Sequence, residues 1–192
     1  RDGNAYETVT IGTQVWMMEN LKTTKYRNGD VIQNITNNTD MNTLVTGAYV
    51  DYLLDASNSN TYGRLYNWYA VGDNRNLAPN GWHVATDAEW STLRKYLGGD
   101  GIQESGAKLK ELGTTHWLKS NIYVTNESKF TALPGGSFGG NYDGTGNWHF
   151  YNIGKTGFWW SSTGYNNDAW AWIIDTDNYT TQRDYNKKFC FS

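Results

Sequence analysis

The sequence lacks most of the residues that mark metal-binding, membrane and nucleic-acid-binding proteins. Only one of its 192 residues is a cysteine, Cys190, so no disulfide forms within the chain and the paired cysteines of zinc sites are missing. No apolar run approaches the roughly 20 residues that a membrane-spanning helix needs. Lys and Arg number 16 against 19 Asp and Glu, and the net charge of −3 gives no electrostatic reason to expect nucleic acid or an anionic membrane as a partner.

Charged residues are also scarce, whereas aromatic residues are abundant. Charged side chains make up 18% of the chain, below the usual value of about 25%, and aromatic ones 16%, with 10 tryptophans. This balance excludes intrinsic disorder and is typical of extracellular β-rich proteins. The chain begins at Arg1 without a methionine or an apolar leader, so we expect a mature or excised segment of an exported protein. No linker is evident, and we expect a single domain over residues 1–192.

Two helices are expected near the middle of the chain. Thr86 is a suitable N-cap, and Glu89, three residues later, completes a capping box. The buried stripe follows at spacings of three and four residues, at Trp90, Leu93 and Leu97. Gly98-Gly99 ends this helix, and a second helix is expected over residues 104–112.

Strands are expected at both ends of the chain. Residues 6–12 alternate with period two, whereas residues 27–60 are polar and rich in turn residues, which predicts mostly loop. A hairpin is expected near the C-terminus, with its turn at Asp177-Asn178, followed by a last strand over 189–191. Its expected inward residues are Trp170, Trp172, Ile174, Thr181 and Arg183. The fold class is therefore α+β, with two helices packed on short antiparallel strands.

Residues that could carry chemistry are isolated in the sequence. His83, His116 and His149 lie far apart and are expected to be packed or surface residues. Cys190 stands between two phenylalanines and is expected to be a buried structural thiol. Loop carboxylates such as those of Asp175 and Asp177 suit calcium better than zinc, but the Asp-x-Asp-x-Asp-Gly loop is absent. We therefore expect no cofactor, with calcium the one metal that the composition leaves open.

The aromatic residues divide into two groups. Trp90, Trp159, Trp160, Trp170 and Trp172 fall on apolar faces and are expected in the core. By contrast, Tyr165, Tyr179 and Tyr185 stand among Asn, Asp and Thr, where burial does not explain them. Surfaces of Tyr, Asn, Ser and Asp are typical of adaptable recognition, although the same composition also fits an ordinary polar surface.

Several long motifs resemble those of the Fibrobacter succinogenes major paralogous domain, over nearly the whole chain. They are Tyr6-x-Thr8-Val9-x-Ile11-Gly12-x-Gln14-x-Trp16-Met17-x-Glu19-Asn20-Leu21, Tyr62-Gly63-x-Leu65-Tyr66-Asn67-Trp68-Tyr69-Ala70-Val71, Gly81-Trp82-His83-Val84-x-Thr86-Asp87-x-Glu89-Trp90, Leu133-Pro134-Gly135-Gly136 and Trp159-Trp160-Ser161-Ser162. The resemblance implies a secreted or lipid-anchored bacterial surface protein with a C-type-lectin-like fold, distantly related to the formylglycine-generating enzyme. It implies no enzymatic activity.

The chain departs from the family pattern at its cysteines. Leu77-Ala78-Pro79 stands where the family commonly has Leu-Cys-Pro, and Cys190 occupies a position that is usually glycine. The usual disulfide and the cysteines of formylglycine chemistry therefore have no counterpart here. The calcium motifs of sugar-binding C-type lectins, Glu-Pro-Asn and Trp-Asn-Asp, are also absent.

The tail from Trp160 to Ser192 is similar to the variable regions that diversity-generating retroelements produce. In such regions outward residues vary while inward residues stay fixed. The residues expected to form a binding face are Tyr165, Asn166, Asn167, Asp168, Ala171, Ile173, Asp175, Asn178, Tyr179, Thr180, Gln182, Asp184 and Tyr185.

These observations predict a non-enzymatic recognition module, secreted or on the cell surface, that binds a protein or a glycan through its C-terminal face. Two alternatives remain open. A glycan-active or formylglycine-generating-like enzyme would need a deep pocket with paired carboxylates or a metal. A structural subunit of a surface appendage would need apolar patches or exposed strand edges near its ends.

Overall fold

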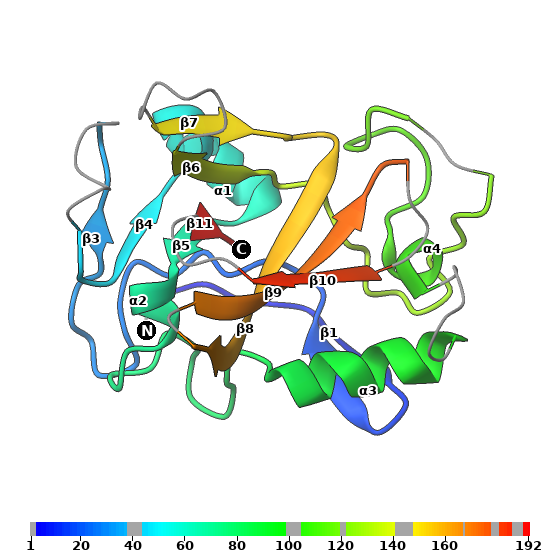
Figure 1. Ribbon diagram of the computed structural model, residues 1–192, viewed down its shortest axis with the longest axis horizontal. Coiled ribbons are helices and arrows are strands. Elements are labelled where there is room, and N and C mark those ends of the chain that lie inside the picture. The colour runs from blue at the N-terminus through cyan, green and yellow to red at the C-terminus, as the bar shows by residue number, and fades with distance from the viewer. Residues whose placement is uncertain are drawn as a thin grey trace.

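The computed structural model contains a larger and a smaller β-sheet, a separate N-terminal hairpin and short helices around them (Figure 1). It describes residues 3–37, 44–98, 105–119, 122–140, 148–166, 168–177, 181–185 and 190–192. The coarse α+β prediction is confirmed. None of the helices in these ranges has the length and apolar character that crossing a membrane requires.

The larger sheet has six strands in the order β3-β4-β5-β11-β6-β7. Their bounds are Gln33–Asn34, Ala48–Val50, Leu65–Asn67, Cys190–Phe191, Ser137–Gly140 and Trp148–Tyr151. The last strand of the chain, β11, thus lies between β5 and β6 and pairs antiparallel with both. The β3–β4 pair is parallel, which the expectation of antiparallel strands alone did not include.

The smaller sheet has the order β10-β9-β8 and consists of the predicted C-terminal hairpin and the strand before it. Its strands are Thr156–Tyr165, Asp168–Asp175 and Thr181–Tyr185, for β8, β9 and β10. Main-chain hydrogen bonds join β8 to the residue after β11: the Ser192 N–H donates to the Phe158 carbonyl, and the Trp160 N–H donates to the Ser192 carbonyl. The end of the described chain therefore connects the two sheets.

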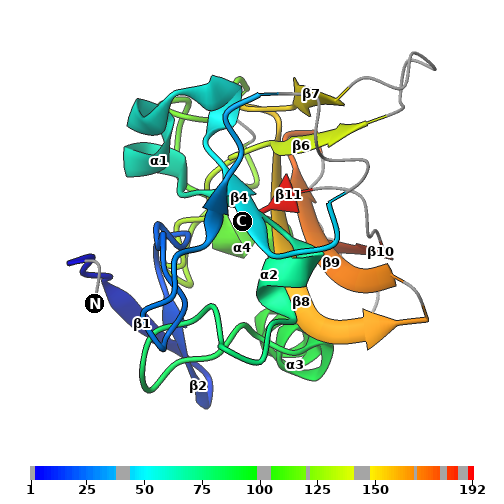
Figure 2. The same cartoon turned by 90° about the vertical axis from the view of Figure 1, so that its left-hand side faces the viewer.

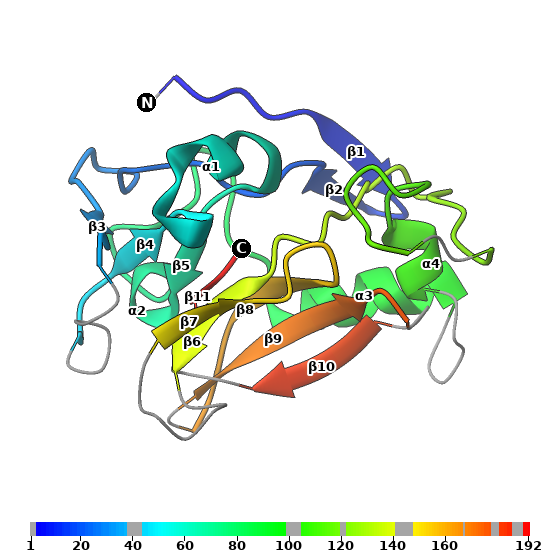
Figure 3. The same cartoon turned by 90° about the horizontal axis from the view of Figure 1, so that it is seen from above.

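The N-terminal hairpin consists of β1, Thr8–Ile11, and β2, Gln14–Met17. It lies far from β6 and β7, as Figure 2 shows from the side. Seen from above, β10 forms an outer edge on the side opposite β1 (Figure 3).

The predicted capping box sets the start of the longest helix, α3, Asp87–Gly98. The Glu89 N–H donates to Thr86 Oγ1 at 3.2 Å, and the Thr86 N–H donates to Glu89 Oε2 at 2.7 Å. The stripe Trp90, Leu93 and Leu97 is buried as expected. The second predicted helix is shorter than expected: α4 spans Ser105–Leu109, after which Lys110 pairs with Ala132 in an isolated bridge.

The polar segment 27–60 is more ordered than its composition predicts. Besides β3 and β4 it contains a 3-10 helix, η1, Tyr52–Leu54, and most of α1, Ala56–Tyr62. The Asp55 carboxylate caps α1 by accepting the Ser57 N–H at 2.9 Å. A further short helix, α2, Trp68–Val71, follows β5. Tertiary burial of Ala48–Val50, whose three residues are all buried, outweighs the turn-rich local sequence here.

Strand β9 separates two of the three hydrophobic clusters. One cluster lies between the two sheets and includes Trp160, Ala169 and Ala171. The other lies against α3 and includes Trp90, Trp159, Trp172 and Ile174. A third cluster lies around β4 and β6 and holds the Cys190 thiol, which is buried as predicted.

Candidate functional site

The predicted C-terminal face is found on β10 and at the turn between β8 and β9. Gln182 and Asp184 are exposed on β10, the edge strand, where they pair in register with Ile173 and Ala171 of β9. Alternation along a strand places Gln182 and Asp184 on the same side of the sheet. The structure therefore brings these two predicted residues together at an accessible edge.

Two more exposed predicted residues lie where β8 meets its turn to β9: Tyr165, the last residue of β8, and Asn166, in the turn. The Tyr165 ring packs against Trp170 with 4.4 Å between ring centroids. Asn166 has a φ of 53°, a left-handed conformation that asparagine tolerates better than most residues. Tyr165 is thus supported by the sheet rather than free in the turn. We call the exposed residues Tyr165, Asn166, Gln182 and Asp184 the C-terminal face.

Ala171 does not belong to this face, contrary to the sequence prediction. Its side chain is only 1% exposed and packs in the cluster between the two sheets, opposite Trp160 in register. The prediction assumed that one face of β9 is exposed to solvent and the other buried. In the structure, hydrophobic clusters cover both faces of this strand. An alanine on an alternating strand fits a solvent-facing position and a tightly packed one equally well.

The other predicted residues take intermediate positions or lie outside the described residues. Asp168, Ile173 and Asp175 are half-buried, and Asp175 accepts the Thr156 hydroxyl at 2.8 Å. Beyond the described part of the chain lie Asn167, Asn178, Tyr179 and Thr180, together with the side chain of Tyr185.

Trp170 also differs from its expected place in the core. It is half-buried, and its outer surface is covered by the Arg183 guanidinium, 3.4 Å from the ring centroid. Arg183 in turn pairs with Asp87 at 2.8 Å. At Trp170, the side of the hairpin that was expected to face the core therefore makes a cation–π contact near solvent.

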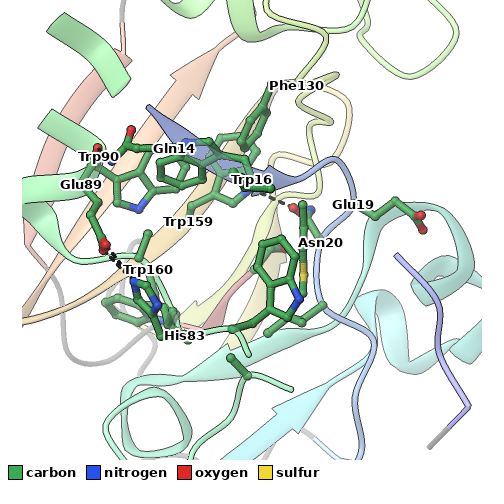
Figure 4. Close-up of a pocket in the computed structure, with 18 of the residues that line it drawn as sticks. Gln14, Trp16, Glu19, Asn20, His83, Glu89, Trp90, Phe130, Trp159 and Trp160 are labelled. Carbon is green, nitrogen blue, oxygen red and sulfur yellow. Dashed lines mark hydrogen bonds and ion pairs between the residues drawn. The ribbon is translucent and has the colours of Figure 1, made fainter. Parts of the chain in front are cut away.

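A second candidate region is an aromatic cavity of about 450 Å³ between the β1–β2 hairpin and the loop before α3. We call it the aromatic cavity. Its aromatic lining consists of Trp16, Trp82, Trp90, Phe130, Trp159 and Trp160. In Figure 4, Trp16, Trp90 and Phe130 lie on one side of the space and His83 on the other. A volume in this range and a mainly apolar wall with several aromatic rings and a few polar groups are typical of small-ligand sites.

Polar groups in the cavity wall are held by hydrogen bonds. The Trp159 indole N–H donates to Asn20 Oδ1 at 2.8 Å, and the Asn20 side-chain amide donates to the Tyr62 carbonyl at 2.8 Å. Gly63 follows Tyr62 with a φ of 75°, and a Cβ at this position would lie 2.4 Å from the Asn20 Cβ. The close approach of these two segments therefore requires a glycine.

Glu89 contributes both to the cavity and to the start of α3. Burial by itself would raise the pKa of the carboxyl, but hydrogen bonds from Thr86 and His83 hold that pKa below its ordinary value. His83 Nε2 lies 2.8 Å from Glu89 Oε1. The carboxylate therefore stays negative at neutral pH, at the cavity wall.

Sequence reasoning missed the aromatic cavity as a site. Its walls come from three distant segments, 13–21, 78–90 and 159–160, joined by Phe130 and Ser192. The available signal was that two of the longest motifs carry tryptophans close to polar residues: Trp16 two positions after Gln14, and Trp82 next to His83. No local pattern says that these motifs face one another.

Among groups that could serve catalysis, the described residues hold two histidine–carboxylate pairs, His83 with Glu89 in the cavity wall and His116 with Glu111, and one buried thiol. Cys190 is fully enclosed, and burial raises the pKa of its thiol well above the ordinary range, which opposes formation of a thiolate. His116 Nδ1 lies 2.8 Å from Glu111 Oε1. Within the described ranges, no three His, Cys, Asp or Glu residues gather as a metal site would require.

The molecule is thus an α+β domain with two sheets joined by its last residues, an aromatic cavity and a polar C-terminal edge. It belongs to the Fibrobacter succinogenes major domain family, whose family model matches residues 9–192. No curated protein and no solved structure matches the chain.

Proposed function

We propose that the domain is a non-enzymatic recognition module of a secreted or cell-surface protein, and that its C-terminal face binds a ligand on another surface. The observation that carries this proposal is the pairing of exposed Gln182 and Asp184 on an edge strand with a neighbouring strand, β9, that is fixed in the core. Amide and carboxylate groups supply directional hydrogen bonds, and Tyr165 supplies rigid contact area. We favour a protein ligand over a glycan, because an edge strand offers a broad surface.

The proposal includes a C-type-lectin-like fold, which the family resemblance supports. It also includes a diversified tail, with variation confined to exposed positions. A tail of this kind would vary at Gln182 and Asp184 and would keep the enclosed Ala171 unchanged. The genomic flank tests this point: a near-copy of the codons for residues 160–192, differing mainly at adenines and lying next to a reverse transcriptase gene, is expected. Without such a copy, diversification is excluded and the binding proposal stands on the face alone.

Binding itself is tested on arrays of purified bacterial surface proteins and glycans with the 192-residue chain. We expect at least one protein ligand whose binding is weakened tenfold or more by the double variant Gln182→Ala and Asp184→Ala. The matched control is Gln33→Ala with Asn34→Ala, which removes two exposed polar side chains from β3, the edge strand of the other sheet. Equal losses in both double variants, or an array without any ligand, would contradict the proposal.

A further inference from the structure

Two rings in the wall of the aromatic cavity keep surface that solvent reaches. Trp16 and Trp82 are half-buried, whereas the other aromatic rings of the lining are buried. The Trp16 ring is fixed by its neighbours, because its centroid lies 4.9 Å from that of Trp90 and 6.0 Å from that of Phe130. The face of an indole ring carries negative partial charge and attracts cations. The accessible part of the aromatic wall therefore suits a cation with an apolar body.

Carboxylates give the same wall a negative charge. Glu19 and Glu89 are both in the lining, and their side chains are 36% and 35% exposed. Both are negative at neutral pH, because the pKa of each carboxyl lies below its ordinary value. The lining residues within the described part of the chain include neither lysine nor arginine. The charge of the wall thus complements a cation.

A smaller adjoining cavity, of about 250 Å³, adds to this charge. The residues common to the two linings are Met17, Glu19, Asn20 and Phe130. The smaller lining also contains Glu7 and Glu111, and its described residues again include neither lysine nor arginine. Lys22 and His116, outside both linings, offset part of the charge: Lys22 Nζ lies 2.5 Å from Glu19, and His116 Nδ1 lies 2.8 Å from Glu111. The negative charge that remains favours a cation over a neutral ligand and repels an anion.

Several acceptors in the wall are already engaged, which disfavours a cation that carries N–H groups. The Glu89 carboxylate accepts from the Thr86 N–H at 2.7 Å and from the Thr86 hydroxyl at 2.9 Å, and it lies 2.8 Å from His83 Nε2. These contacts occupy three of its roughly four lone-pair positions. Asn20 Oδ1 accepts from the Trp159 indole. A primary ammonium has three N–H groups that would lose their water here, whereas a quaternary ammonium has none and needs no acceptor.

We propose that the aromatic cavity is a second binding site, independent of the C-terminal face, and that it takes a small quaternary ammonium compound without an anionic group, such as choline. The methyl groups, which share the positive charge, pack on the rings of Trp16 and Trp82. Glu19 and Glu89 supply the electrostatic attraction. A zwitterion such as glycine betaine brings a carboxylate for which the described lining residues offer no lysine or arginine.

The test is an NMR titration of the 192-residue chain with choline and three comparison ligands, following the indole N–H signals. The tert-butyl analogue of choline, in which carbon replaces nitrogen, keeps the shape without the charge. Ethanolamine keeps a charge but carries N–H groups, and glycine betaine adds a carboxylate. We expect choline to bind with a Kd of roughly 1 mM or below. Each comparison ligand should bind at least tenfold more weakly than choline.

Glu89→Gln separates the charge of the site from its shape. Glutamine can also complete a capping box with Thr86, so α3 should keep its start. The affinity for choline should fall roughly threefold to fivefold, while binding of the neutral tert-butyl analogue stays unchanged. The matched control is Glu127→Gln, which neutralises an exposed carboxylate outside both linings, paired with Lys108. This control should leave choline binding as it is.

Trp82→Ala removes an accessible ring from the lining and should weaken choline binding at least tenfold. Tyr123→Ala removes an exposed ring outside the lining and should leave binding unchanged. Thermal unfolding without ligand shows whether each variant is folded, and Glu89→Gln decides the point if Trp82→Ala is not. Gln182→Ala with Asp184→Ala should retain choline binding, and Trp82→Ala should retain the array ligand of the C-terminal face.

The ligand comparison on the unmodified chain can overturn the proposal by itself. It is overturned if choline does not bind, or if the neutral analogue, ethanolamine or glycine betaine binds as tightly as choline. It is also overturned if Glu127→Gln or Tyr123→Ala weakens choline binding as much as the cavity variants do. Loss of the array ligand alone, in the C-terminal variants, leaves choline binding in place and contradicts neither site.

Discussion

The aromatic cavity and the C-terminal face both take residues from strand β8, yet they are built in different ways. In the cavity, side chains are fixed by partners from distant segments, as Trp159 is by Asn20 and Gln14 is by the Glu89 carbonyl. On the face, Gln182 and Asp184 project from an edge strand into solvent. Substitution of Gln182 is therefore expected to leave the fold intact, whereas substitutions in the cavity wall disturb several contacts at once.

This difference is useful in a recognition protein. An exposed side chain on an edge strand, such as that of Gln182, can change the specificity at little cost in stability. A cavity whose side chains are packed and hydrogen-bonded to one another can maintain one specificity, but it tolerates few amino-acid substitutions. The following experiments test how far this contrast holds, beginning with a buried residue behind the cavity wall.

Trp172→Ala should have the largest effect, because the buried Trp172 ring supports Trp90 of the cavity wall from behind and its strand carries β10. Its ring stacks on Trp90 with 6.0 Å between centroids, its N–H donates to Asp87, and it pairs in register with Arg183 of β10. It is 2% exposed. Truncating a buried tryptophan costs about 3–5 kcal/mol of unfolding free energy. Urea denaturation measures this loss, and a cost below about 1 kcal/mol would show that the cavity wall does not depend on packing against Trp172.

Ala171→Tyr tests whether β9 is covered on both sides. If Ala171 packs between the sheets, a tyrosine there overpacks the core and should cost about 3 kcal/mol, the upper end of the usual range. On an outward-facing position the same substitution would be nearly neutral. The comparison variant is Ile173→Tyr, at a half-buried position on the same side of β9, for which we expect a smaller loss. Equal and small losses of stability in both variants would show that Ala171 is exposed and belongs to the C-terminal face.

Lys110, which contacts the end of β9, should make the free energy of unfolding depend on pH. Burial lowers the pKa of its amine to about 8, although the ammonium donates to the carbonyls of Asp175 and Thr176 at the end of β9. Between pH 8 and about 10.5 the unfolded chain holds this proton while the folded one has lost it, so stability rises with pH in this interval. The slope for one proton is at most about 1.4 kcal/mol per pH unit.

Lys110→Met should remove this rise, and the measurement is urea denaturation at pH 7.5, 8.5 and 9.5 for both proteins. Buried tyrosines, such as Tyr52, have pKa values raised by burial and oppose the rise at higher pH, but they act equally in the two proteins. Lys119→Met, at an exposed ion pair with Asp177, is the control and should leave the rise in place. Parallel pH profiles for wild type and Lys110→Met would disprove the assignment.

Local signals in the sequence predicted the parts of the fold that depend on local contacts. The capping box of Thr86 and Glu89 fixed the start of α3, because both partners lie within one turn. The burial of β9 on both faces was not predictable in the same way, because alanine fits an exposed strand position as well as one that a second sheet covers. The aromatic cavity was out of reach for a related reason: Trp16 and Trp159 meet only through the tertiary fold, more than a hundred positions apart in the sequence.

The smallest effect on stability is expected for Gln182→Ala, and this result is the most informative about the C-terminal face. Gln182 is exposed on the edge strand, and its main-chain pairing with Ile173 does not depend on its side chain. The free energy of unfolding should change by less than about 0.5 kcal/mol. A stability loss above about 1 kcal/mol would instead assign Gln182 a structural role. Unchanged stability together with weakened binding to the array ligand would identify a side chain that acts in recognition, because structural damage is then excluded as the cause.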